Sequence, residues 1–285
     1  MLFSRRHFES RKYEGKTMKK KLIGVCALCG KEKELTFEHL PPNKAFNFAP
    51  AKPVKGEDFI HAFADTNRAP WDLTGLRYQN QQKGMGAYSL CQTCNNLTGT
   101  WYGDSYVDFA KRMDFLLIKE GLMGQKSAEF VVKKIHPQRI IKQVISIFCS
   151  INRDIYDDPR ISELREFVLD KNAVSLDKGK YKVCMYLTSG GLTKYCGLTV
   201  LLETNGKGNI ESRCLSEFCS YPLGFLVYFD LKEDEPFLGT DITTFSDYQY
   251  EDVADFQISA PIFENNSWIP EDTRSKDEIE QTMKK

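Results

Sequence analysis

The sequence has no long apolar run. No stretch of its 285 residues approaches the roughly 20 consecutive apolar residues of a membrane-spanning helix. Near Met1 there is also no shorter apolar run suited to a signal peptide. These absences argue against a membrane partner and give no indication of export, so we expect a cytoplasmic protein. No internal repeat is visible.

The chain also lacks net charge, because 39 Lys and Arg residues balance 39 Asp and Glu residues. The field of the whole molecule therefore does not attract a polyanion, and a nucleic-acid partner has to be bound by a local patch. Hydrophobic residues make up 41% of the chain, enough to bury a core. The length suits one large domain or two smaller ones.

Two CxxC pairs stand out among the nine cysteines. They are Cys26 with Cys29 and Cys91 with Cys94. Each pair holds two thiolates about one turn apart, and two pairs close a four-sulfur zinc site, which is structural because no position stays open. Gly30 and Asn95 directly follow the pairs, and both residue types tolerate the positive φ of a tight turn. The pairs therefore predict a structural Zn²⁺.

Redox activity of a CxxC pair and chance spacing are the alternatives to zinc. The remaining cysteines lie in apolar or strand-like surroundings, where free buried thiols are expected in a reducing compartment. They are Cys149, Cys184, Cys196, Cys214 and Cys219.

Glu38 and His39 follow the first pair and bring two kinds of chemistry together. Histidine suits a general base because its side chain titrates near neutral pH. A carboxylate suits a hard cation such as Mg²⁺ or Mn²⁺, which prefers oxygen ligands. Because neighbouring strand residues point to opposite faces, the pair needs a bend to reach one point, and we expect it at Leu40-Pro41-Pro42.

Three motifs occur in a fixed order. They are Cys26-x-x-Cys29-Gly30, then Thr36-x-Glu38-His39-x-x-Pro42, then Leu90-Cys91-x-x-Cys94-Asn95. This order resembles the zinc-knuckle branch of the HNH endonucleases over about residues 22–102. The resemblance implies a ββα-metal core, in which a hairpin and a helix clasp one catalytic divalent cation, with a separate zinc stapling the hairpin to the helix.

The resemblance also implies roles for individual residues. His39 would be the general base that deprotonates the attacking water, and Glu38 a ligand of the catalytic Mg²⁺ or Mn²⁺. Asn95 matches the closing position, which acts as a ligand or orienting group, and Asn96 takes that place if the register shifts by one. The other histidines, His7, His61 and His136, have no such context, and no catalytic role is expected for them.

The chain departs from the family pattern in two ways, since the stretch between Phe46 and Met85 exceeds a minimal hairpin loop and an expected Asn is missing. The family carries an Asn about six residues before the third cysteine, where it braces the loop bearing the base. Met85 and Gly86 occupy that region here, and Asn80 comes too early. This departure motivates a second hypothesis, a zinc-stapled module that binds without hydrolysis.

We expect an α+β protein in four segments. They are a basic extension at 1–21, a zinc-binding HNH-like module at 22–102, a helical segment at 103–171 and a mainly β region at 172–285. Within the extension, Met18 resembles a natural start, so residues 1–17 are expected to be a vector-derived or mis-annotated addition.

Hydrophobic periodicity places the later elements. Helices are expected over about Asp104–Glu120, from Pro137, and from Asp158-Pro159. Mainly antiparallel strands are expected at Tyr181–Leu187, Thr193–Glu203, Ile210–Cys219 and Gly224–Asp230, with a hairpin turn at Asn205-Gly206-Lys207-Gly208. The tail from Glu271 is expected to fray or form a short helix.

The first functional hypothesis is thus a metal-dependent endonuclease that acts on DNA, with double-stranded DNA as the expected substrate. Its expected biological context is phage restriction or mobile elements. The second is a non-catalytic module that binds nucleic acid or a protein through residues 66–86 or the C-terminal sheet. Segment 66–86 mixes cations, aromatics and amides of the kind that contact a nucleic-acid backbone. A redox protein using CxxC is a third hypothesis.

Overall fold

A computed structural model describes residues 21–63, 72–190, 193–204, 210–232, 235–263 and 280–281. The basic extension up to residue 20, residues 66–71 of the polar segment, the turn at 205–208 and nearly all of the tail lie outside these ranges. Among the helices of the described ranges, none is both long and apolar enough to cross a membrane.

The N-terminal part is built on a three-stranded antiparallel sheet with the order β1-β2-β3. Its strands are β1 (Ile23–Val25), β2 (Glu32–His39) and β3 (Gly86–Cys91). Helix α2 (Gln92–Thr98) follows β3 without a loop. In the register of β2 and β3, Glu38 lies opposite Ala87 and His39 opposite Gly86. The sheet therefore brings the Glu-His pair and the second cysteine pair onto adjacent strands.

The long connection between β2 and β3 folds back on itself. It contains α1 (Gly56–Phe63). Isolated bridges pair Ala51 with Gln81 and Val54 with Tyr78, so the two ends of the connection run antiparallel, side by side. The described parts of this connection thus form a ribbon next to β3.

The three predicted helices are present close to their expected limits. They are α3 (Asp104–Lys119), α4 (Pro137–Ile151) and α5 (Pro159–Leu169). Pro137 and Pro159 occupy first turns, where a missing N–H costs nothing. The Asp158 side chain caps α5 by accepting from the Arg160 N–H. A π-helical turn, Gly99–Gly103, links α2 to α3.

The second sheet has seven strands, with the order β4-β10-β5-β8-β7-β6 and β9 beside β5. They are β4 (Ser127–Ile135), β5 (Tyr181–Thr188), β6 (Lys194–Thr204), β7 (Ile210–Ser220), β8 (Leu223–Phe229), β9 (Thr240–Asp241) and β10 (Ala254–Phe263). All pairs are antiparallel except β10 with β5. The prediction of a mainly antiparallel sheet is confirmed.

Strand β4 corrects the expectation that residues 103–171 are helical throughout. Ala128, Phe130 and Val132 are buried in it, whereas Glu129 and Val131 are exposed. This alternation is typical of an edge strand with one face on the core. Its partner β10 lies more than a hundred residues later, so no local turn signal announced it.

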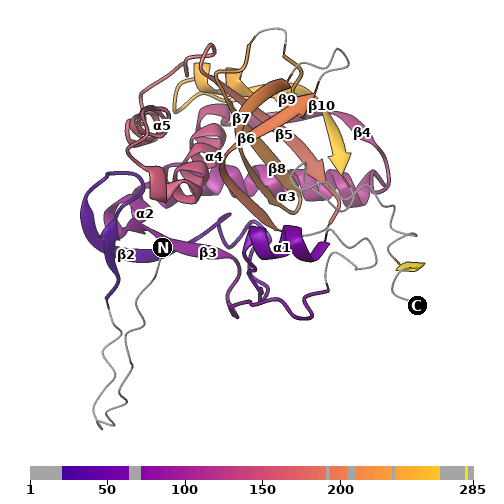
Figure 1. Cartoon of the computed structure of the whole chain (residues 1–285). Coiled ribbons are helices and arrows are strands. Elements are labelled where there is room, and N and C mark those ends of the chain that lie inside the picture. The colour runs from indigo at the N-terminus through magenta and orange to yellow at the C-terminus, as the bar shows by residue number, and fades with distance from the viewer. Residues whose placement is uncertain are drawn as a thin grey trace, which may run out of the picture.

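Helix α4 lies at the centre of the molecule. Thirteen of its fifteen residues are buried, and it contacts α3, α5, β3, β6 and β7. A helix that is buried on nearly all sides belongs in an interior, and the buried residues of α4 include five polar or charged ones, Gln138, Lys142, Gln143, Ser146 and Ser150. Figure 1 shows α4 behind the strands of the large sheet, with β2, β3 and α2 along the lower side of the molecule. One hydrophobic cluster joins the two sheets through this helix, from Leu28 and Leu90 to Val183 and Phe225.

Truncating a buried side chain of α4 tests this arrangement. Ile145 is fully buried, so Ile145→Ala should lower the free energy of unfolding by about 2–5 kcal/mol through lost burial and a residual cavity. Urea denaturation measures the change. Ile118→Ala, at a site 56% exposed on α3, is the matched control and should cost less than about 1 kcal/mol. Equal effects at both sites would contradict the central position of α4.

Candidate functional site

The four predicted zinc ligands cluster. The Sγ atoms of Cys26, Cys29, Cys91 and Cys94 all lie within 4.8 Å of one another, and those of Cys29 and Cys91 are 4.0 Å apart. Four sulfurs at the usual Zn–S distance of about 2.3 Å form a tetrahedron with edges of about 3.8 Å. The cluster therefore fits a metal ion and is consistent with a structural zinc.

The two pairs reach the cluster by different local structures. After the first pair the chain turns at Gly30, whose φ is +67° and whose N–H donates to the Cys26 carbonyl at 2.9 Å. The prediction of a matching turn at Asn95 is wrong, because Asn95 lies within α2. Cys91 ends β3 and Cys94 lies in the first turn of α2, so the helix itself brings the second pair of sulfurs together and Asn95 continues it.

Hydrogen bonds and burial shift the pKa values of the cysteine thiols in the cluster. A hydrogen bond from the Cys94 thiol lowers the pKa of Cys26 to about 4. The pKa of Cys94 is raised, first by that same bond and then by burial, and burial also raises the pKa of Cys29. The thiols alone thus favour one thiolate shared among neighbours. A bound divalent ion deprotonates all its thiol ligands, because its charge offsets their mutual repulsion.

A cleft of about 230 Å³ opens beside this cluster. Three of the predicted catalytic residues line it, namely Glu38, His39 and Asn95. Asn96 lies on the exposed side of α2, where its Oδ1 accepts from the Gln92 side chain at 2.7 Å. Lys44 lines the cleft as well and adds a cation. The structure thus gathers the residues of the Glu-His-x-x-Pro and Cys-Asn motifs at one hollow.

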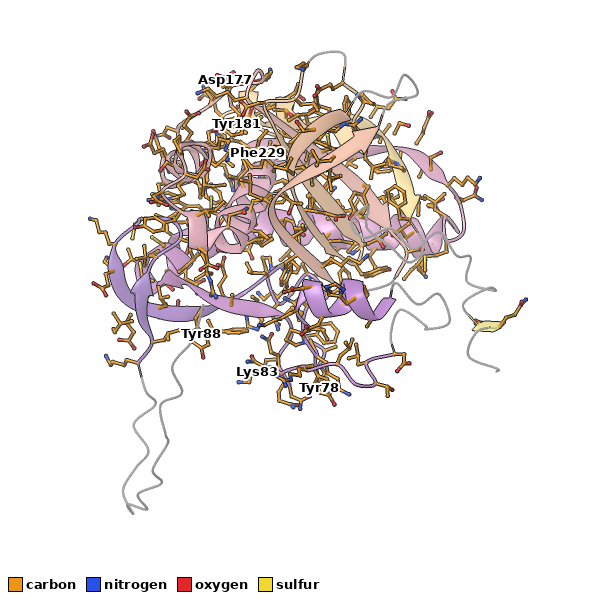
Figure 2. The ribbon with its side chains drawn as sticks, in the orientation of Figure 1. Tyr78, Lys83, Tyr88, Asp177, Tyr181 and Phe229 are labelled. Atoms are coloured by element: carbon orange, nitrogen blue, oxygen red, sulfur yellow. The ribbon has the colours of Figure 1, made fainter. Side chains whose placement is uncertain are left out.

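The ring of His39 is held in a defined orientation. Its Nε2 lies 2.9 Å from the Lys83 carbonyl oxygen, and the Phe37 ring packs edge-on at 5.1 Å. Since a carbonyl only accepts hydrogen bonds, Nε2 carries the proton of the neutral ring and Nδ1 keeps its lone pair. Lys83, labelled in Figure 2, is on the strip of chain below β3. The half-buried His39 therefore presents one basic nitrogen.

Glu38 differs from the open ligand that the sequence predicts. The residue is 5% exposed, and its Oε2 accepts from Ser89 Oγ at 3.0 Å and from Ser150 Oγ at 2.7 Å. Burial raises its pKa to about 7, against the lowering effect of the two hydroxyls. Because both hydroxyls contact Oε2, the other oxygen, Oε1, is the one that could bind a ligand in the cleft.

Asn95 braces the strand that carries the pair. Its Nδ2 donates to Thr36 Oγ1 at 3.0 Å and to the Phe37 carbonyl at 3.3 Å. With the amide nitrogen directed at β2, the amide oxygen is directed away from the strand. Asn95 thus fixes the position of β2, and its side chain lines the cleft.

Asn47 is a site residue that the sequence did not reveal. Its Nδ2 donates to the carbonyls of Pro41 and Met85, at 2.7 and 2.8 Å, and its Oδ1 accepts from the Met85 N–H at 2.7 Å. The side chain therefore closes the loop that follows His39. The family pattern places a bracing Asn in the region of Met85 itself, but here the brace comes from a residue 38 positions earlier. Gly84, at φ +92°, packs against the Asn47 backbone, where a Cβ would lie 2.1 Å from its oxygen.

Removing one sulfur tests the metal centre. Cys91→Ser should lose most of the bound zinc and lower the melting temperature, because metal binding is coupled to folding. Metal analysis of the purified protein should give one zinc per wild-type chain. Cys149→Ser, at a buried thiol of α4, is the control and should keep its zinc. Full zinc occupancy in Cys91→Ser, or thiols that react freely in the native wild type, would favour a redox or unpaired role.

The burial of Glu38 predicts a dependence of stability on pH. Because its folded-state pKa, about 7, exceeds the ordinary 4.5, the folded state holds the proton more tightly than the unfolded state. The associated stability is present below about pH 4.5 and is lost as the pH rises through 7. The full loss amounts to about 3 kcal/mol.

Urea denaturation of wild type and Glu38→Gln, with excess zinc and no magnesium, isolates this contribution. The stability of the wild type relative to the variant should fall between about pH 5 and pH 8. Glu129→Gln, at an exposed carboxylate of β4, is the control and should follow the wild type. Parallel curves for wild type and Glu38→Gln would show that Glu38 titrates normally.

Comparisons with known proteins give no relative, since no family model, no curated protein and no solved structure matches the chain. The likeness to the HNH endonucleases therefore rests on the motif residues of 22–102 themselves. Function has to be inferred from the contacts of the cleft.

Proposed function

We propose that this protein is a metal-dependent endonuclease that hydrolyses phosphodiester bonds in DNA. The observation that carries the proposal is the convergence of Glu38, His39 and Asn95 on one cleft beside the four-cysteine cluster. Each has a side-chain group suited to part of the reaction. The structural zinc would hold the strands and the helix that present them.

His39 would act as the general base. Its Nε2–H is bonded to the Lys83 carbonyl, so Nδ1 accepts the proton of the attacking water. As the ring becomes positively charged, the bond to the carbonyl strengthens, because a charged donor makes a stronger hydrogen bond. The Phe37 ring limits rotation of the imidazole. The position of the base is thus fixed before substrate binds.

The donor set of the cleft fits a hard cation. Glu38 and Asn95 offer a carboxylate oxygen and an amide oxygen, the ligand types that Mg²⁺ and Mn²⁺ prefer. Such an ion, when bound, supplies positive charge to the phosphate and to the leaving oxygen. Lys44 would add a further positive charge for the substrate phosphate. The chain's own task is to hold these donors around one small space.

The surface around the folded-back connection suits a nucleic acid. The Lys52 ammonium lies 5.0 Å from the centre of the Tyr78 ring, and Tyr78 and Tyr88 are 44% and 47% exposed. Figure 2 shows Tyr78, Lys83 and Tyr88 along the lower side of the molecule, away from Asp177, Tyr181 and Phe229. Lysines contact phosphates, and exposed rings pack against sugars or unpaired bases. This surface lies next to the loop that orients His39.

A second candidate function is a zinc-stapled binding module that does not cleave. The enclosure of Glu38 favours it, because a carboxyl with a pKa of about 7 is only partly ionised at neutral pH. Such a module would bind DNA with strong salt dependence and leave it intact under every divalent ion. The predicted protein partner of the C-terminal region also stays a prediction.

Plasmid nicking tests the endonuclease. The zinc-loaded protein should nick supercoiled DNA with Mg²⁺ or Mn²⁺, and His39→Ala should slow nicking by about 10²- to 10⁴-fold through loss of the base. His61→Ala, at an exposed histidine of α1, is the control and should nick like wild type.

Unchanged nicking in His39→Ala would remove this residue as the base. Salt-dependent DNA binding by the wild type, with no nicking under either ion, would select the binding module. Binding should be measured on the same DNA, so that a failure to bind is not mistaken for a failure to cleave.

A further inference from the structure

Two residues from outside the zinc-binding segment also line the cleft. Asp104 is the first residue of α3 and is exposed, whereas Gln143 belongs to α4 and is only 3% exposed. A Cβ built on Gly103 would lie 4.0 Å from Gln143 Oε1, so this oxygen lies close to the backbone that precedes Asp104. The lining of the cleft thus includes two more oxygen-bearing side chains, one from α3 and one from α4.

The amide oxygen of Gln143 has no hydrogen-bond partner among the described residues. Oε1 is enclosed and makes no hydrogen bond to any residue that the structure describes. Buried acceptors are nearly always satisfied by protein or by ordered water. A buried acceptor without a partner beside a cleft therefore indicates a place where water or a ligand binds.

Gln143 is part of a polar stripe on the buried helix α4. Positions 143, 146 and 150 are spaced three and four residues apart and therefore lie on one face of α4. Ser150 uses that face to donate to Glu38 at 2.7 Å. Ser146 lies between the two, fully buried, and its Oγ also lacks a partner within the described ranges. The stripe follows the inner wall of the site from the cleft to Glu38.

Asp104 is the open carboxylate of the cleft. None of the ion pairs among the described residues involves it, whereas Asp108, one turn later, pairs with Arg112 at 2.8 Å. Lys44 is the cation that lines the same hollow. Glu38, by contrast, is enclosed and already accepts two hydroxyls. A cation entering the cleft therefore meets Asp104 as its accessible anionic donor.

We propose that Asp104 is a ligand of the divalent cation in this cleft and that Gln143 is a positioning residue for it. The Asp104 carboxylate contacts the ion, and Gln143 Oε1 accepts a hydrogen bond from one of the waters that the ion retains. Mg²⁺ and Mn²⁺ prefer oxygen donors, and Mg²⁺ keeps several waters when bound to protein. The inference rests on the proposed function, and it adds α3 and α4 to the site.

Mn²⁺ binding to the zinc-loaded full chain tests the inference without substrate. Titration of free Mn²⁺, followed by its electron paramagnetic resonance signal, should give weaker binding for Asp104→Asn and for Gln143→Met, by about 10- to 100-fold. Gln143→Glu keeps an oxygen at the position and should retain binding. Asp108→Asn and Gln138→Met are matched controls on the same two helices and should bind like wild type. Gln138 also has an enclosed, unpartnered Oε1 but does not line the cleft.

Cleavage assays on the same variants separate this inference from the proposed function. Wild type that binds Mn²⁺, with weaker binding in both variants, supports the cation site even if no DNA is cut, in which case the endonuclease fails alone. Nicking by the wild type, with unchanged Mn²⁺ affinity and nicking in both variants, overturns the cation site and leaves the endonuclease standing. A wild type that binds no Mn²⁺ overturns the cation site as well.

Discussion

Closure of the four-cysteine cluster is the constraint on which the site depends. It ties the turn after β1 to the junction of β3 and α2, two points more than sixty residues apart in the chain. The Cys91 N–H also donates to Cys26 Sγ at 3.3 Å, so this sulfur already accepts a hydrogen bond from the end of β3. With β3 held there, β2 pairs with it in a register that places Glu38 and His39 beside α2. An ion that neutralises the thiolates makes this closure favourable, and its loss would release both strands.

The rest of the chain supports β2, the strand that carries Glu38 and His39. Ser150 of α4 bonds to Glu38, and Arg165 of α5 donates to the Leu28 carbonyl at 2.7 Å, within the knuckle. Tyr195 of β6 donates to the Leu40 carbonyl, directly after His39. Contacts from α4, α5 and β6 thus hold the turn between Cys26 and Cys29 and the end of β2 in place, and a change in α4 reaches the cleft through Ser150 and Glu38.

Much of the architecture could be predicted from local signals. Prolines at first helical turns and apolar periodicity located α3, α4 and α5. The change of period after about Lys180, together with the hairpin signal at Asn205-Gly206-Lys207-Gly208, located β5 to β8. The cysteine cluster followed from spacing and from the chemistry of thiolates. The helices and strands depend on residues close together in sequence, where turn chemistry and periodicity act, and each cysteine pair is marked by its own short spacing.

What sequence could not supply depends on tertiary contacts. Asn47 braces Met85 across 38 positions, with no motif to mark it. Ser150, which is 112 positions away, donates a hydrogen bond to the buried Glu38. The buried Gln143 becomes a candidate site residue only when the cleft that it lines is known. The second cysteine pair turned out helical because a helix start, like a knuckle, brings residues three apart together.

X-ray absorption at the zinc edge of the purified protein tests the central claim most directly. Closure of both cysteine pairs on one ion predicts a first shell of four sulfurs at about 2.3 Å and no lighter ligand. A first shell in which nitrogen or oxygen replaces any of the sulfurs would contradict it. That result would mean that the pairs do not close on one ion, and the alignment of β2, β3 and α2 would then need another cause.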